Sequence, residues 1–175
     1  TGHATACAAA GDLTAARTAC GQVFAPGVLE AVDSTWTTSL AQLAEVCWML
    51  EEPAWCARLA QLLEPLADRM AVTGMGAVCL GSLQRPLALA RDGAGDLDGA
   101  ITAIDRAVAV SEDQGIDLWL ARSLAERSLL LERRGEPGDA EQVEADRVRA
   151  HELADRLGIR LALGPTEYPA PRRSP

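Results

Sequence analysis

Apolar and polar positions along most of the chain follow the period of an amphipathic helix. In "DGAITAIDRAVAV" (98–110), Ala100, Ile104, Ala107 and Val108 fall on one face at 3.6 residues per turn. Runs of β-branched and aromatic residues, which are typical of strands, are scarce. The pattern therefore predicts an all-α protein.

A repeat emerges when the turns between these amphipathic segments are aligned. Four six-residue blocks resemble one another, and the alanines that end them are 41, 43 and 40 residues apart. A steady period near 40 residues is typical of helical solenoids, in which each helix pair packs only on its neighbours. The blocks, which predict repeat corners near residues 11, 52, 95 and 135, are "GDLTAA" (11–16), "EPAWCA" (52–57), "GDLDGA" (95–100) and "GEPGDA" (135–140).

Each corner separates a long first helix from its partner helix. The first helices are expected at 35–50, 76–91 and 116–133, where apolar residues recur at helical spacing. The partner helices carry small and large residues in alternation, which allows two helices to approach closely. We expect a right-handed, tetratricopeptide-like solenoid of helical hairpins, with about seven helices over residues 11–160.

The two ends of the chain differ from the repeat region. Residues 1–10 fit either a helix or a flexible tail. Residues 161–175 are rich in proline, which predicts an irregular C-terminal tail.

Two prolines lie inside predicted helices. An interior proline removes one backbone hydrogen bond and clashes with the preceding turn. We therefore expect helix 53–68 to bend or stop near Glu64, just before Pro65, and helix 76–91 to kink near Pro86.

The segment "GAGDLDGAITAID" (93–105) resembles a calcium-binding loop. Such a loop needs about six or seven oxygen ligands, and its first position here is Ala94, which has no side-chain oxygen. We expect Asp96 to cap a helix instead, with Asp98 and Asp105 as helical residues. His3 and Cys7 supply only two of the four ligands of a zinc site. No metal or other cofactor is predicted.

The charge of the chain excludes two classes of function. The formal net charge is −9, and all 16 basic residues are arginine. An acidic protein does not favour duplex nucleic acid, whose binding needs clustered basic residues. A nucleotide-binding P-loop requires a lysine, and the chain has none.

Cysteines and histidines do not form a catalytic pattern. The five cysteines include no C-x-x-C pair, and free thiols indicate a reducing, cytoplasmic setting. Neither histidine lies in a recognisable nucleophile–base arrangement, so no enzyme activity is predicted. No apolar run approaches the roughly 20 residues of a membrane span, and no membrane association is expected.

Four segments together resemble a known family. They are "LAEVCWMLEEPAWCARLAQLLEPLADR" (43–69), "CLGSLQR" (79–85), "GIDLWLARS" (115–123) and "RGEPGDAE" (134–141). The set is similar to the tetratricopeptide-like C-terminal region of large bacterial signal-transduction ATPase regulators, of the LuxR type, the SARP type and the adenylate-cyclase-linked type. The resemblance covers about residues 11–160. It departs from the family at Pro86, where an aromatic residue is common.

The resemblance implies a sensing or scaffolding role. In that family a central ATPase precedes the repeats, so the partners would be neighbouring domains of the same regulator, another protein or peptide, or a small-molecule inducer. The chain has no recognisable helix-turn-helix, so this region is not expected to bind nucleic acid directly. The family supplies no catalytic residues for the repeats.

Three residues are candidates for partner contact. Arg85 and Arg122 lie on predicted first helices, which line the concave face of such solenoids, and could contact an acidic partner segment. The alternative is that both arginines are solvated or cap helices. Trp55 lies near a corner and is expected to be partly exposed, whereas Trp36 and Trp119 are expected in the core.

The sequence thus predicts a non-catalytic protein- or ligand-interaction module within a bacterial regulator. The alternative is a free-standing tetratricopeptide adaptor that assembles protein complexes.

Overall fold

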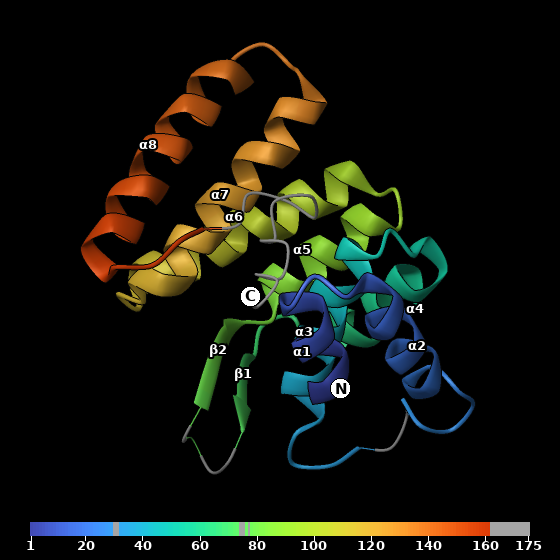
Figure 1. Cartoon of the computed structure of the whole chain (residues 1–175). Helices are drawn as coiled ribbons and strands as arrows, with labels where there is room; N and C mark the ends of the chain where they lie inside the picture. Colours follow the sequence, from blue (N-terminus) through green and yellow to red (C-terminus); the bar gives the residue numbers. More distant parts are fainter. Residues whose placement is uncertain (30–31, 74–75, 77, 162–175) are drawn as a thin grey trace, which may run out of the picture.

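The computed structural model describes residues 1–29, 32–73, 76 and 78–161, and most of them are helical (Figure 1). The predicted all-α class is therefore met only broadly, because the described residues form eight α-helices rather than about seven, together with a small two-stranded sheet. The elements are α1 (Gly2–Ala9), α2 (Leu13–Val23), α3 (Trp36–Met49), α4 (Pro53–Leu63), the 3₁₀ turn η1 (Glu64–Leu66), β1 (Met70–Thr73), β2 (Val78–Ser82), α5 (Gln84–Gly93), α6 (Leu97–Asp113), α7 (Asp117–Arg134) and α8 (Asp139–Leu157).

The predicted corners fall between helices. Gly11, Gly95 and Gly135 have φ angles of 78°, 89° and 67°, the left-handed conformation that ends a helix at little cost for glycine. The carboxylate of Asp96 accepts a hydrogen bond of 3.0 Å from the backbone N–H of Gly99 and so caps α6, as expected. The segment that resembles a calcium loop is thus a helix start.

The expected helix over 76–91 is wrong. Strand β2 occupies its first part and pairs antiparallel with β1, with Val72 opposite Cys79 and Thr73 opposite Val78. These positions include three β-branched residues, which favour extended backbone. Gly76 and Gly81 have positive φ angles that no α-helix contains. The helix begins only at Gln84.

The two prolines behave differently. Helix α4 ends at Leu63 and Pro65 lies in the 3₁₀ turn that follows, which confirms the predicted stop. Pro86 is the third residue of α5, where a backbone N–H has no partner within the helix. The expected kink at Pro86 is therefore absent, because the helix starts there rather than passing through it.

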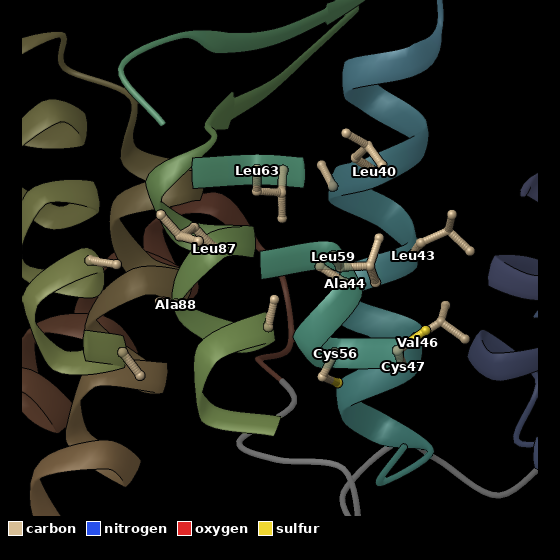
Figure 2. Close-up of a cluster of buried hydrophobic side chains, with 14 of the residues drawn as sticks. Leu40, Leu43, Ala44, Val46, Cys47, Cys56, Leu59, Leu63, Leu87 and Ala88 are labelled. Atoms are coloured by element: carbon tan, nitrogen blue, oxygen red, sulfur yellow. The ribbon is translucent and has the colours of Figure 1, made fainter. Parts of the chain in front are cut away.

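The N-terminal half of the core lies where α3, α4 and α5 meet (Figure 2). Its buried side chains are mostly leucine, alanine and cysteine, and the small ones allow close helix contact. Cys20, Cys47 and Cys56 are buried, and all five cysteines are free. Burial raises the pKa of the Cys56 thiol to about 12, so this thiol is protonated at neutral pH.

Helix α5 is central to the packing. It contacts α3, α4, α6 and β2, and every residue from 81 to 90 is buried. Its polar residues have partners from other elements: Gln84 donates to Asp68 over 3.3 Å, and Asp92 accepts from the indole N–H of Trp48 over 2.7 Å. A buried polar group without such a partner would lower stability by roughly 1–3 kcal/mol.

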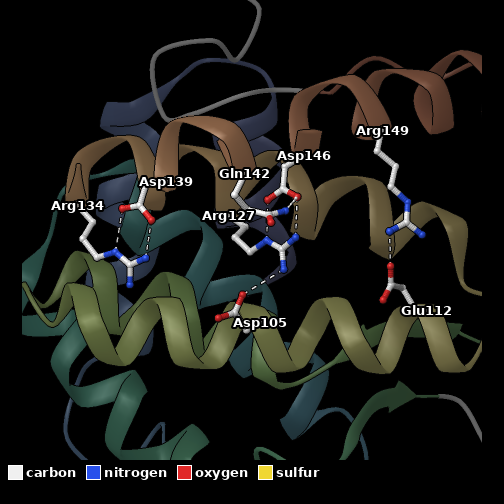
Figure 3. Close-up of polar contacts among 8 residues, drawn as sticks. All are labelled: Asp105, Glu112, Arg127, Arg134, Asp139, Gln142, Asp146 and Arg149. Atoms are coloured by element: carbon white, nitrogen blue, oxygen red, sulfur yellow. Dashed lines mark hydrogen bonds and ion pairs between the residues drawn. The ribbon is translucent and has the colours of Figure 1, made fainter. Parts of the chain in front are cut away.

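The last three helices are joined by arginine–carboxylate pairs (Figure 3). Arg127 on α7 binds the buried Asp146 of α8 through two hydrogen bonds of 2.6 Å, and reaches Asp105 of α6 over 3.1 Å. Arg149 of α8 pairs with Glu112 of α6. These pairs lie beside a small apolar cluster that includes Leu124 and Leu153.

The ends of the chain are described only in part. Residues 2–9 form helix α1, which packs on α2 and α3. Of the expected C-terminal tail, residues 162–175 lie outside the described residues. In the described part of the chain, no helix has both the length and the apolar character needed to cross a membrane.

Substitution of Gly81 tests the packing of the hairpin. A Cβ atom at position 81 would lie 2.7 Å from Cγ of Trp119, and φ is +79°. We expect Gly81→Ala to lower the free energy of unfolding by about 2 kcal/mol or more, measured by urea denaturation. Gly95→Ala is the control, because φ there is +89° but no atom lies within 4 Å. Equal losses in the two variants would contradict the close contact with Trp119.

Acid should weaken the start of α8. Two hydrogen bonds from Arg134, of 3.0 and 2.6 Å, lower the pKa of the Asp139 carboxyl, and burial only partly opposes them. A lowered pKa stabilises the folded state above the unfolded value of about 3.9, and this contribution is lost as the pH falls through the folded value. Asp139→Asn should therefore lose less stability than the wild type between neutral pH and about pH 3 in urea denaturation. The exposed Asp155→Asn should follow the wild type, and an unchanged acid response in Asp139→Asn would contradict this role.

Candidate functional site

A cavity of ≈ 240 Å³ lies between four helices and one strand. Its wall combines apolar side chains with a small number of polar ones, as in ordinary ligand pockets. The lining residues are Thr5, Ala8 and Ala9 of α1, Ala41, Gln42, Glu45, Val46 and Met49 of α3, Leu80 of β2, Arg85 and Pro86 of α5, and Trp119 and Arg122 of α7.

The lining helices alternate along the chain. Helices α1, α3, α5 and α7 all contribute side chains to the cavity, whereas α2, α4, α6 and α8 contribute none of the lining residues. Four helices that are not adjacent in the chain order therefore line one cavity.

Arg85 is a buried residue of the cavity wall. It is 5% exposed, and its Nε donates to Oε2 of Glu126 over 2.8 Å while Nη2 pairs with Oε1 of the same carboxylate. Its Nη1 donates to Oε2 of Glu45 over 3.3 Å. The two-point pairing with Glu126 fixes the plane of the guanidinium, because a carboxylate matches its fork of donors.

Arg122 also lines the cavity and is more exposed than Arg85, with 29% of its side chain accessible. Its Nη2 donates to Oε1 of Glu45, so this carboxylate bridges the two arginines. Among the described residues, no acceptor is found for the N–H groups of its Nε and Nη1. These donors are available to a bound molecule.

The indole ring of Trp119 contacts both arginines. The guanidinium carbons of Arg85 and Arg122 lie 5.6 and 5.5 Å from the centre of its ring, within the range of cation–π attraction. Its indole N–H donates to the backbone oxygen of Cys79 over 3.3 Å, and Gly81 lies against the ring. The hairpin and α7 are thereby joined at the cavity wall.

The positive and negative charges of Arg85, Arg122, Glu45 and Glu126 are equal in number. Two guanidiniums, of Arg85 and Arg122, face two carboxylates, of Glu45 and Glu126. Burial opposes the charge of Arg85, but Glu126 and Glu45 outweigh it and hold the arginine pKa above its ordinary value. Burial raises the pKa of the Glu126 carboxyl, and Arg85 and Arg122 only partly offset this.

The structure brings two of the three predicted contact residues together. Arg85 and Arg122 line one cavity, but Arg85 is buried and ion-paired within the chain rather than open to a partner segment. Trp55 is half-buried elsewhere and stacks on Phe24, with ring centres 4.9 Å apart and planes 8° apart. Trp36 is partly buried against the core, whereas Trp119, expected in the core, lines the cavity.

Sequence reasoning missed Glu45 and Glu126. Glu45 lies 40 residues before Arg85, and Glu126 lies 41 residues after it. Charges of alternating sign therefore occupy one column of the 40-residue repeat. Alignment of the repeats by charge, rather than by apolar residues alone, would have revealed this column.

A second cavity, of ≈ 290 Å³, lies beside the hairpin and α6. Its polar side chains include Asp68, Arg106 and Gln114, which are exposed, and only Ser82 and Gln84 are buried polar residues. It has no buried charged group and no aromatic side chain, so the first cavity is the stronger candidate for a binding site.

The side chains that line the first cavity are apolar, amide, hydroxyl, guanidinium and carboxylate groups and one indole. Its charged groups pair with one another, and it contains no histidine or cysteine. Within the described residues, no group of three or more histidine, cysteine or acidic side chains is placed to hold a metal ion.

Comparison of the chain with protein-family models, curated proteins and solved structures finds no match.

Removal of one partner from the buried pair should be costly. We expect Arg85→Met and Glu126→Gln each to lower the free energy of unfolding by about 3–5 kcal/mol, since each leaves a buried group without its partner. The double variant should lose clearly less than the sum, as measured by urea denaturation in a double-mutant cycle. The exposed pair of Arg149 and Glu112 is the control, and Arg149→Met should cost less than about 1 kcal/mol. Additive losses at Arg85 and Glu126 would contradict direct coupling.

Proposed function

We propose that the chain is a non-catalytic, tetratricopeptide-like interaction module, and that the cavity between α1, α3, α5 and α7 is its ligand- or partner-binding site. The observation that carries the proposal is that alternate helices supply every helical residue of the cavity wall. In a right-handed solenoid of helical hairpins, the first helices line the inner face, where partners bind.

The spacing of long-range contacts supports the repeat. Glu45, Arg85 and Glu126 are linked at separations of 40 and 41 residues, and Cys79 contacts Trp119 at a separation of 40. Such contacts arise when equivalent positions of neighbouring repeats stack. Strand β2 takes the place of the first turns of the helix expected over 76–91, so the hairpin between α4 and α5 shortens α5 and leaves the spacing near 40 residues.

The sequence resemblance supports a setting for this module. We propose that it serves as the sensor or scaffold region of a bacterial transcriptional or signalling regulator, in which a bound inducer, a protein or a neighbouring domain shifts the regulator between two states. The shift can be no larger than the difference in ligand affinity between those states.

Filling the cavity tests the proposal. Ala9 is exposed and lines the cavity from α1, so Ala9→Leu should occupy the space while changing stability by no more than about 0.5 kcal/mol. Ala6→Leu is the matched control, because Ala6 is exposed on the same helix and does not line the cavity.

Wild type and the two variants would be compared by thermal shift against a set of small metabolites and peptides. Ligands that bind the folded state raise the melting temperature of the wild type and of Ala6→Leu, and we expect no shift for Ala9→Leu. Ligands that shift all three proteins equally would show that binding occurs elsewhere.

A further inference from the structure

The volume, polarity and charge of the cavity indicate which class of ligand it would bind. Its volume of ≈ 240 Å³ holds roughly ten non-hydrogen atoms at the packing density of protein interiors. This volume suits one small molecule. The apolar wall includes Val46, Met49 and Leu80, which suit a hydrocarbon body.

The polar wall offers both donors and an acceptor. Nε and Nη1 of Arg122 have no acceptor among the described residues, and the side-chain amide of Gln42, which also lines the cavity, has no partner there either. A molecule with a carbonyl oxygen would accept from Arg122, and an N–H or O–H of the molecule would donate to Gln42.

Among the described residues, the charges at the wall are matched by ion pairs. Arg85 and Arg122 line the cavity together with Glu45, and Arg85 is also paired with the buried Glu126, which does not line it. A charged ligand would therefore lose its hydration near a group of four charges whose sum is zero. The net charge of −9 further disfavours an anion at long range. A neutral polar group has the smallest loss of hydration in this environment.

We infer that the cavity selects a small, uncharged, amphipathic molecule of about ten non-hydrogen atoms that carries a carbonyl or amide group. This inference rests on the proposed function, in which the cavity is the binding site. The carbonyl lies at Arg122 and the hydrocarbon body lies against α3 and β2.

Three probes of one shape and different charge test the inference by isothermal titration calorimetry on the whole chain. They are hexanamide, hexanoate and hexylammonium. The wild type should bind hexanamide saturably at one site, and should bind each charged probe at least about tenfold more weakly. Ala9→Leu should bind none of them.

Removing one charged side chain from the cavity should change which of the three probes binds most tightly. Glu45→Gln leaves one guanidinium in excess, so hexanoate should bind this variant more tightly than hexanamide does. Arg122→Met leaves one carboxylate in excess and should favour hexylammonium. Glu112→Gln removes the same charge as Glu45→Gln at an exposed site on α6 and should keep the wild-type order.

The outcomes separate the inference from the proposed function. If hexanoate or hexylammonium binds the wild type as tightly as hexanamide does, the cavity does not select uncharged ligands. If Ala9→Leu then abolishes this binding, the cavity is still supported as the binding site. Binding of hexanamide that is equal in wild type and Ala9→Leu would overturn both. No binding of any probe to the wild type would overturn the inference alone, since the metabolite and peptide comparison of Ala9→Leu with Ala6→Leu decides the proposed function separately.

Discussion

The structure depends on the burial of helix α5 from all sides. This helix carries two largely buried charges, the cation Arg85, which is 5% exposed, and the anion Asp92, which is 9% exposed. A buried charge is tolerated only when partners inside the protein replace its hydration. Glu45 and Glu126 do so for Arg85, and Trp48 and Arg133 do so for Asp92. The neighbouring helices are therefore fixed in register with α5 by charge as well as by packing.

This matching of charges also shapes the cavity. Because Glu45 bridges Arg85 and Arg122, helices α3, α5 and α7 meet at one polar group, and Trp119 attaches the hairpin beside it. Arg122 also lines the cavity, and its Nε and Nη1 have no acceptor among the described residues. A site that is electrically balanced before a ligand arrives favours hydrogen bonding and shape over charge in recognition.

Much of the fold could be predicted from the sequence, because its signals are local. Gly11, Gly95 and Gly135 end helices through their own backbone freedom, and Asp96 caps α6 through a contact three residues away. The hairpin was missed because the 40-residue register was extended through residues 76–83, although glycines and β-branched residues there disfavour a helix. The charged residues at the cavity could be predicted only in part. Arg85 and Arg122 are ion-paired rather than solvated because of contacts with residues 40 or more positions away, which a local sequence pattern does not reveal.

The central claim is that the space enclosed by alternate helices is where this protein binds its ligand. Nuclear magnetic resonance of the four tryptophan indole N–H groups tests it most directly, because only Trp119 among them lines the cavity. Titration with hexanamide should shift the Trp119 signal, assigned by its loss in Trp119→Phe, and leave those of Trp36, Trp48 and Trp55 in place. A shift confined to the other tryptophans, or an unmoved Trp119 signal at saturation, would contradict the account.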